Sequence, residues 1–394
     1  IGGRRADRSR RSVSLGAAVS YDVLVIGAGI VGAACAAELA AAGMQVCIVE
    51  RDCVGSGATA AGMGHIVAMD SSPAELALTR YSQQLWDALI AAQPEQHEYA
   101  RSGTLWVAAD AEELAVVESK HSFYHAHGIA SAALDAAGLY AAEPNLRPGL
   151  AGGLLVPGDG VVYPPRSALA LIAQAKRDGA TLHPGTVSAI QDDGVLLADG
   201  GRLRAAAVLI ANGSACVELA PELPIRAKKG HLVITDRYPG FVRHQLVELG
   251  YIKNAHASAG DSVAFNVQPR PSGQILIGSS RQFDRAGVPL GGQVDQPILR
   301  QMLQRAAAYL PAIADLSCLR VWTGIRAASP DGLPLIGPHP WRRNVWLAVG
   351  HEGLGITTAL GTAKILAAQL LDRACAIAVA PYLATRSFDE VLHG

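Results

Sequence analysis

The chain has 394 residues, with 33 Lys and Arg against 34 Asp and Glu and a formal net charge of −1. This length is enough for two intertwined domains with a large core, and the balanced charge argues against a cationic nucleic-acid-binding protein, so no nucleic-acid partner is expected. The six cysteines form no C-x-x-C pair; we interpret them as buried small hydrophobic residues in a reducing compartment and expect no disulfide framework and no metal site from them.

Residues 1–20 carry five arginines and one aspartate but no apolar signal-peptide core, and we expect them to form a basic, disordered segment. The uncharged run at 23–37 has the composition of a membrane anchor, of a buried strand and helix, or of a phosphate-binding turn. It is shorter than the roughly 20 apolar residues that a membrane-spanning helix needs. We therefore expect no transmembrane segment and a cytoplasmic protein, associated with a membrane only peripherally, through partners.

The residues around this run predict a strand, a turn, a helix and a second strand. Residues 23–27 are a short apolar run, 30–42 have a helical pattern, and 45–49 form another apolar run. Glu50 closes the second strand. This order indicates a βαβ unit.

The turn within this unit fits the dinucleotide-binding pattern G-x-G-x-x-G at Gly27, Gly29 and Gly32, and Glu50 follows at the spacing that the pattern requires. Gly27 permits the tight turn, Gly29 lets the backbone approach a diphosphate, and Gly32 lets the helix pack on the strand. The free N–H groups and the positive dipole end of the helix then bind phosphate. Glu50 can accept hydrogen bonds from a ribose hydroxyl, so the run is interpreted as a phosphate-binding turn.

A second loop of small residues, GSGATAAGMGH at 55–65, follows directly. A nicotinamide enzyme needs no such loop after the acidic residue, which disfavours an NAD-dependent dehydrogenase. A flavin does need one, because its diphosphate and ring system lie farther along the same groove, where Ser56, Thr59 and backbone N–H groups are available.

The rest of the chain predicts helices at 73–92, 112–127, 166–178 and 297–309, a buried strand at 207–211, and a return to strand, glycine turn and long helix at 344–371. The long strands of 226–320 predict a mostly antiparallel sheet. The predicted fold is α/β: a Rossmann-like FAD-binding domain built from discontinuous segments, with an inserted, mostly antiparallel α+β substrate domain. Its predicted boundaries are 21–84, 150–225 and 321–380 for the first domain, 85–149 and 226–320 for the second, and 381–394 for a C-terminal tail. His121, His125 and His127 lie in a polar helix and are interpreted as solvated, so no metal site is expected.

Three motifs in this order, the glycine turn, GSGATAAGMGH and TGIRAASPDGLPLIG…GHEGLGIT, resemble the FAD-dependent family of D-amino-acid oxidase, glycine oxidase and the sarcosine oxidase β subunit. The resemblance covers residues 21–375. Within the family, AAGMGHIVAMD and AGGLLVPGDGVVYPP are most similar to the FAD-bearing β subunit of D-hydroxyproline dehydrogenases, a subgroup that resembles a hydrogen cyanide synthase subunit.

The resemblance implies which residues bind FAD. They are Gly27, Gly29, Ile30, Val31, Gly32, Glu50, Arg51, Ser56, Gly57, Thr59, Ala60, Gly62, Met63, Gly64, Val187, Ala211, Gly213, Gly353, Leu354, Gly355, Ile356 and Thr357. The last five belong to a helix start that would stabilise the negative charge of the reduced flavin. Monomeric sarcosine oxidases bind flavin covalently through a cysteine in the segment that corresponds to Gly324 and Ile325, so FAD is expected to be non-covalent here.

The resemblance also implies catalytic positions. Arg326 matches the arginine that binds the substrate carboxylate, although Ala327 stands where the family often has proline. A planar, permanently charged guanidinium suits a carboxylate, and the sequence offers Arg326 no acidic neighbour before Asp331. Tyr251 is a second candidate contact for the substrate carboxylate or amine. His351 and His65 are candidates for positions near the flavin ring, each with an alternative structural role.

The expected reaction is FAD-dependent dehydrogenation of a small amino acid or cyclic imino acid, D-hydroxyproline- or D-proline-like, by hydride transfer from the α-carbon to flavin N5. The chain would act as the catalytic β subunit of a hetero-oligomer, with FMN or an iron–sulfur cluster on partner subunits or at an interface. One alternative is a glycine, sarcosine or D-amino-acid oxidase that uses O2. Another is a flavin-carrying subunit without catalysis of its own.

Overall fold

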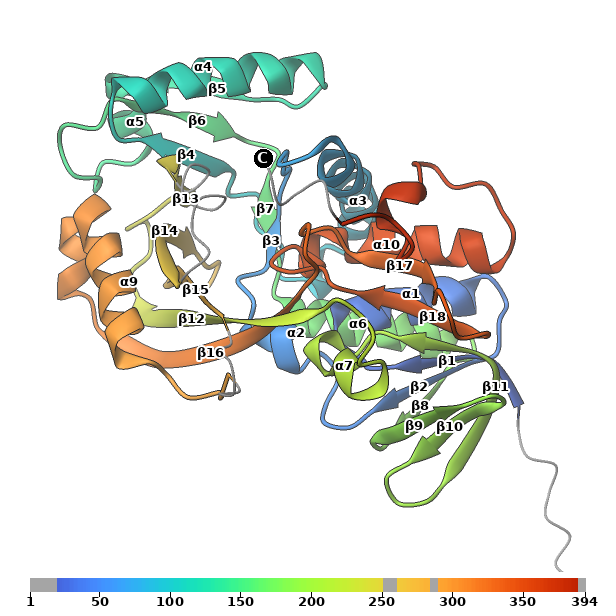
Figure 1. Cartoon of the computed structure of the whole chain (residues 1–394). Helices are drawn as coiled ribbons and strands as arrows, with labels where there is room; N and C mark the ends of the chain where they lie inside the picture. The colour runs from blue at the N-terminus through green and yellow to red at the C-terminus, as the bar shows by residue number, and fades with distance from the viewer. Residues whose placement is uncertain (1–19, 251–260, 284–289, 389–394) are drawn as a thin grey trace, which may run out of the picture.

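The computed structural model describes residues 20–250, 261–283 and 290–388, and its two large sheets lie side by side (Figure 1). The first sheet has the order β17-β18-β11-β1-β2-β8. Its strands are β1 (Ser20–Ile26), β2 (Val46–Glu50), β8 (Thr181–Pro184), β11 (Arg202–Ile210), β17 (Leu335–Pro338) and β18 (Val345–Val349), with the hairpin β9 (Val187–Gln191) and β10 (Gly194–Leu197) joined to β11. Three separated segments of the chain therefore build this sheet, as the sequence predicts.

The central strands of the first sheet are parallel and buried. β1 pairs in parallel with both β2 and β11, and Val23, Leu24 and Val25 are fully buried. Such uninterrupted apolar strands are typical of a parallel sheet that is covered on both faces. The alanine-rich helix α1 (Ile30–Ala41) packs between α6 (Pro164–Arg177) and α10 (Gly355–Leu370), and α3 (Pro73–Ala92) packs against α10.

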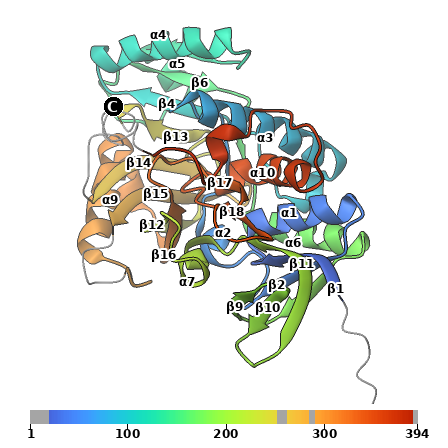
Figure 2. The same ribbon diagram turned by 45° about the vertical axis from the view of Figure 1, so that its right-hand side comes forward.

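The second sheet has the order β16-β12-β15-β14-β13-β4-β6-β5. Its strands are β4 (Thr104–Ala108), β5 (Ala132–Asp135), β6 (Gly152–Val156), β12 (Arg226–Arg237), β13 (Gln245–Glu248), β14 (Ser262–Pro269), β15 (Gln274–Phe283) and β16 (Cys318–Ala328). All these pairs are antiparallel except β13 with β4. Figure 2 shows α4 (Ala111–Ala126) above this sheet and α9 (Gln296–Tyr309) at its side.

The second sheet takes two strands from ranges that the sequence analysis assigned to the FAD-binding domain. β6 falls in the range 150–225, and β16 extends into the range 321–380. β6 completes a pairing with β4 and β5, and β16 forms the edge beside β12. Local patterns indicate a strand but not its sheet, so both assignments differ from the observed pairing.

Five helices, α1, α3, α4, α6 and α9, begin and end within two residues of their predicted limits, which are 30–42, 73–92, 112–127, 166–178 and 297–309. The prediction for the cysteines is right for Cys35, Cys47 and Cys216, which are buried, but wrong for Cys53 and Cys318, which are exposed. Cys53 lies in the loop after β2, and Cys318 begins the edge strand β16. Within the described ranges, no helix combines the length and apolar character needed to cross a bilayer.

Candidate active site

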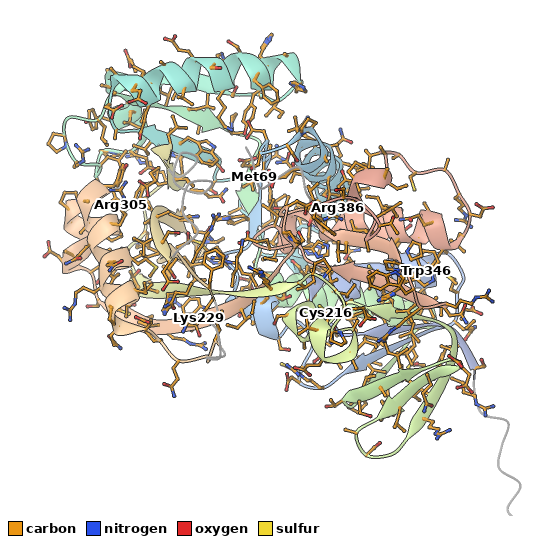
Figure 3. All side chains as sticks on the ribbon, viewed as in Figure 1. Met69, Cys216, Lys229, Arg305, Trp346 and Arg386 are labelled. Atoms are coloured by element: carbon orange, nitrogen blue, oxygen red, sulfur yellow. The ribbon has the colours of Figure 1, made fainter. Side chains whose placement is uncertain are left out.

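A cavity of about 1550 Å³ has walls from both domains. It extends from the glycine turn after β1 to the strands β12 and β16 of the second sheet. Two residues of its wall, Met69 and Arg386, are labelled in Figure 3 and lie in the middle of the molecule. Pockets for drug-sized ligands usually measure about 300–1,000 Å³, so this cavity has room for a dinucleotide together with a small second ligand.

The first end of the cavity is the turn between β1 and α1. Gly27 has a φ of 103°, and a Cβ atom on it would lie 2.9 Å from the carbonyl oxygen of Ala211. A Cβ atom on Gly32 would overlap the carbonyl oxygen of Gly27. These two glycines therefore let α1 begin directly against the ends of β1 and β11, which exposes the start of the helix to the cavity.

Two side chains fix this turn through its backbone amides. Glu50 Oε2 accepts a hydrogen bond from Ala28 N at 2.6 Å, and Thr59 Oγ1 accepts one from Ile30 N at 3.0 Å. Glu50 and Thr59 both line the cavity. The carboxylate thus holds the turn and still has lone pairs to accept further hydrogen bonds from a ligand.

Most of the residues predicted to bind the cofactor line this one cavity. They are Gly27, Gly29, Ile30, Val31, Glu50, Arg51, Ser56, Gly57, Thr59, Gly62, Met63, Gly64, Val187, Ala211, Gly213, Gly353, Leu354, Gly355 and Ile356. They come from four parts of the chain that are far apart in sequence. Their assembly around one space is what a bound dinucleotide requires.

Three of the predicted residues do not line the cavity. Gly32 faces the backbone of Gly27, and Ala60 is exposed because the short helix α2 (Gly57–Ala61) turns Ala61 inward instead. The Thr357 hydroxyl donates a hydrogen bond to His65 O at 2.8 Å and so joins α10 to β3 (His65–Ile66). The geometry thus assigns these three residues to packing around the cavity and not to its wall.

Arg326 lies at the second end of the cavity, on β16. It pairs across strands with Lys228 of β12, which also lines the cavity. The guanidinium lies over Gly230, where a Cβ atom would approach Arg326 Nη2 to 2.7 Å. The absence of a side chain at Gly230 therefore makes room for the arginine head group on the face of the sheet that borders the cavity.

The acidic partner of Arg326 comes from a distant part of the sequence. Glu352 Oε1 lies 3.7 Å from Arg326 Nη1 and 3.8 Å from Lys228 Nζ. Burial alone would raise the pKa of Glu352. The positive charges of Arg326, Arg281 and Lys228 outweigh burial and hold this pKa below its usual value, so Glu352 is an anion at neutral pH.

Asp331, the nearest acidic residue in the sequence, does not contact Arg326. It forms a two-point ion pair with Arg386, with distances of 2.6 Å from Nε to Oδ2 and 2.8 Å from Nη2 to Oδ1. Arg326 therefore lies on the same wall of the cavity as Glu352, which is 26 positions away in the sequence.

The two predicted histidines line the cavity and are held neutral. Burial lowers the pKa of His351 to about 3, and its Nε2 lies 3.0 Å from Thr362 Oγ1 within α10. Burial lowers the pKa of His65 to about 4. Neither imidazole carries a positive charge at neutral pH, and the ring of His351 lies within hydrogen-bond distance of α10, the helix that follows it. The fourth predicted catalytic residue, Tyr251, lies outside the described residues.

A sequence model of the family described as "FAD dependent oxidoreductase" matches residues 22–369. The chain belongs to this family. It is 31% identical to the glycine oxidase of Geobacillus kaustophilus over 94% of this chain and 98% of that protein. The crystal structure of glycine oxidase from the same organism superposes with a TM-score of 0.82, at 29% identity, and the alignment covers 93% of this chain and 99% of that one.

Two further relatives of this FAD-dependent oxidoreductase have other names. The hydrogen cyanide synthase subunit HcnC of Pseudomonas aeruginosa is 26% identical over 93% of this chain and 96% of that protein. A D-amino acid dehydrogenase of Xanthobacter autotrophicus is 30% identical over 76% of this chain and 70% of that protein.

FAD fits the residues that this oxidoreductase presents. The glycine turn leaves the start of α1 open to a diphosphate, and Glu50 stands beside it. None of the six cysteines, all of which lie in the described ranges, lines the cavity. A Cβ atom on Gly324 would lie 2.5 Å from Ala61 Cβ, so that position has no room for a side chain. The cavity therefore suits FAD held without a cysteinyl bond.

The sequence analysis missed several polar residues of the cavity. Asp159 is 1% exposed, and its Oδ1 accepts hydrogen bonds from Ala68 N at 3.1 Å and Gln83 Nε2 at 3.0 Å. Burial raises its pKa to about 7. Lys120 forms a close ion pair with Asp70 beside it on the same wall. Asp159 stands in the AGGLLVPGDGVVYPP motif and Glu352 in the GHEGLGIT motif, but neither carboxylate is among the predicted site residues.

Among the described residues, no group of three or more His, Cys, Asp or Glu side chains is arranged to hold a metal ion. His121 Nδ1 lies 2.8 Å from Ser131 Oγ, and His127 Nδ1 lies 2.8 Å from Phe123 O. These two histidines of the predicted polar helix are thus paired locally.

Proposed function

We propose that this FAD-dependent oxidoreductase dehydrogenates a small α-amino acid or cyclic imino acid of the D-hydroxyproline or D-proline type at its α-carbon. One observation carries the proposal: Arg326 lies on the wall of the same cavity that begins at the glycine turn. A dinucleotide that starts at this turn and a carboxylate bound by Arg326 would occupy one continuous space. The names of the relatives, glycine oxidase and D-amino acid dehydrogenase, support an amino-acid substrate.

FAD, when bound, supplies the acceptor for the hydride that leaves the α-carbon. The residues of the chain contribute orientation and electrostatics. Arg326 would hold the substrate carboxylate by two parallel hydrogen bonds, which fixes the direction of the α-carbon. The start of α10, from Gly355, directs its free N–H groups and positive dipole end toward the cavity and would stabilise negative charge there.

The two histidines that line the cavity within the described ranges are not suited to act as charged acids in this reaction. His351 and His65 both have lowered pKa values, because they are buried. The proposal therefore assigns no proton-donating step to an imidazolium. The amine would react in its neutral form, which it reaches by losing a proton to water. The product would be an imine, which hydrolyses in water or, from a cyclic amine, remains as a pyrroline.

We also propose that the chain works as the catalytic subunit of a hetero-oligomer. The relative HcnC is named as a subunit of hydrogen cyanide synthase, and this supports the proposal. Electrons would then pass to FMN or an iron–sulfur cluster on a partner or at an interface.

The test of the substrate class is an anaerobic titration of the purified, FAD-loaded protein with D-hydroxyproline, D-proline, glycine and sarcosine. Loss of the flavin absorbance band on addition of one of them identifies the class. Failure of all four to reduce the flavin would contradict the proposal.

Two measurements separate the alternatives. Fast reoxidation of the reduced protein by air, with peroxide formation, would support an oxidase that uses O2, and slow reoxidation supports a dehydrogenase. Robust turnover of the isolated chain with an artificial dye would exclude a flavin-carrying subunit without catalysis of its own.

A further inference from the structure

Glu352 is a half-buried anion, and its buried oxygen Oε1 has no hydrogen-bond partner among the described residues. Its side chain is 17% exposed, and it borders the cavity beside Arg326. Oε2 accepts a hydrogen bond from Gly353 N at 2.6 Å, but Oε1 accepts none. A buried carboxylate oxygen without a donor is costly, so its presence on a cavity wall indicates a ligand that donates to it.

The cations near Oε1 do not supply this donor. Arg326 Nη1 at 3.7 Å and Lys228 Nζ at 3.8 Å are within range of electrostatic attraction but beyond hydrogen-bond distance. The two cations keep Glu352 ionised but donate no hydrogen bond to Oε1. Lys228 also lies over the ring of Phe283, with Nζ 5.3 Å from the ring centroid, which offers it a second favourable contact away from the carboxylate.

The backbone holds Glu352 in this position at a conformational cost. Its φ is 49°, in the left-handed region that non-glycine residues rarely adopt. Glu352 N donates to Ala327 O at 2.8 Å, and Ala328 forms a bridge with His351. These contacts fasten the residue beside Arg326 on β16. Strain of this kind is typical of residues that a functional site holds in place.

We propose that Glu352 receives the amino group of the substrate whose carboxylate binds Arg326. This inference rests on the proposed function, because it adds the second half of the recognition of an α-amino acid. In an α-amino acid the carboxylate and the amine are attached to the same carbon, and the wall of the cavity presents a fixed cation and a fixed anion next to each other. Arg326 and Glu352 together would select molecules that carry both groups and would fix which face of the α-carbon is presented.

The competing explanation is that Glu352 only balances the three neighbouring positive charges. The two explanations differ in what happens to ligands with and without an amine. A suitable pair is 2-aminoisobutyrate and pivalate, which have nearly the same shape and differ in an ammonium against a methyl group. Neither has an α-hydrogen, so neither can be dehydrogenated, and dissociation constants can be measured from the change in flavin absorbance of the FAD-loaded protein.

Glu352→Gln is expected to weaken binding of 2-aminoisobutyrate about tenfold or more, the usual effect of losing a hydrogen bond to a charged group. Binding of pivalate should be unchanged or tighter, because the variant removes the carboxylate of Glu352, which competes with pivalate for Arg326. Equal weakening of both ligands, or unchanged binding of 2-aminoisobutyrate, would overturn the inference.

Three further variants complete the test. Asp87→Asn removes an exposed carboxylate outside the cavity wall and should leave the ratio of the two dissociation constants unchanged. Lys228→Met leaves Glu352 in place and should favour binding of 2-aminoisobutyrate over pivalate. This variant tests the inference even if Glu352→Gln loses FAD. A ratio of dissociation constants that does not shift toward 2-aminoisobutyrate would contradict the inference. Arg326→Lys should weaken both ligands, and pivalate binding that is indifferent to this change would contradict the proposed function itself.

Discussion

Gly32 packs directly against the carbonyl oxygen of Gly27, with no space for a Cβ atom between α1 and the end of β1. Gly32→Ala should therefore push the helix away from the strand, since the backbone oxygen it meets cannot rotate aside. We expect a loss of about 1–3 kcal/mol in the free energy of unfolding, as for other overpacked sites. FAD content should fall as well, because the start of α1 moves.

Thermal unfolding and the ratio of flavin to protein absorbance measure the two effects of Gly32→Ala. Gly291→Ala is a suitable control, because a Cβ atom there meets no atom of the described residues within 4 Å and the φ of Gly291 is not positive. Equal stability and equal FAD content in both variants would show that the close contact is not needed.

The βαβ unit could be predicted from sequence because its signals are local. The strand, the glycine turn and Glu50 all lie within residues 21–50, and each has a spacing that one helix and two strands dictate. The assembly of the cavity from distant segments followed only from the family resemblance. Nothing in the spacing of Val187 or Gly353 shows that both border the space that begins at Gly27.

The charge pairs could not be predicted from sequence. Arg326 has Asp331 five positions away, yet Asp331 pairs with Arg386, and Arg326 lies beside Glu352. These choices follow from the pairing of β16 with β12 and from the return of the chain after α10, which are contacts between segments far apart in the sequence. The same limit explains why β6 and β16 were assigned to the other domain.

Gly230→Ala should displace the guanidinium of Arg326 without removing it. A Cβ atom at this position would lie 2.7 Å from Arg326 Nη2, so the head group must shift. We expect KM for the substrate to rise, roughly tenfold or more, since two parallel hydrogen bonds to a carboxylate depend on exact placement. Steady-state kinetics gives KM, and the flavin absorbance of the purified protein gives FAD content, which should not change. An unaltered KM would argue against Arg326 as the carboxylate anchor.

The buried Asp159 should make the unaltered protein less stable as the pH rises. Asp159→Asn should abolish this dependence on pH. Burial raises the pKa of Asp159 to about 7, from an ordinary value of 3.8. Between about pH 4 and pH 7 the unfolded chain releases this proton and the folded chain keeps it, so the free energy of unfolding falls across that range. Because a tenfold change in proton affinity is equivalent to about 1.4 kcal/mol, the loss over this range is on the order of 4 kcal/mol.

The asparagine can keep the contacts of Asp159, because Ala68 N and Gln83 Nε2 both donate to the single oxygen Oδ1. Denaturant unfolding at a series of pH values should show the variant gaining stability relative to the unaltered protein as the pH rises toward 7. The same change at exposed Asp87 is the control. A constant difference between variant and unaltered protein across this range would contradict the assignment.

The ion pair of Asp331 with Arg386 fastens the segment near the C-terminus to the loop that follows β16. The two side chains are only 7% and 9% exposed, and Arg386 also donates to Leu333 O at 2.7 Å. Removing one partner leaves the other charge buried without a counter-charge, so Arg386→Met and Asp331→Asn should each cost about 3–5 kcal/mol. The double variant should lose less than the sum of the two, because the second change no longer breaks a pair.

The contribution of this pair should also depend on pH. Burial would raise the pKa of Asp331, but Arg386 outweighs it and holds the pKa below the ordinary 3.8. A lowered pKa in the folded state means that the stabilisation is complete above about pH 4 and is lost as the pH falls through the lower folded value. In Arg386→Met nothing offsets burial, so the pKa of Asp331 rises above 3.8 and the variant regains stability as this carboxylate is protonated. The stability difference between the unaltered protein and Arg386→Met, measured by denaturant unfolding, should therefore be largest at neutral pH and shrink as the pH falls to about 4 and below. A difference that stays constant at still lower pH would show that the hydrogen bonds of Arg386 to backbone carbonyls, and not its charge pair, provide the stabilisation.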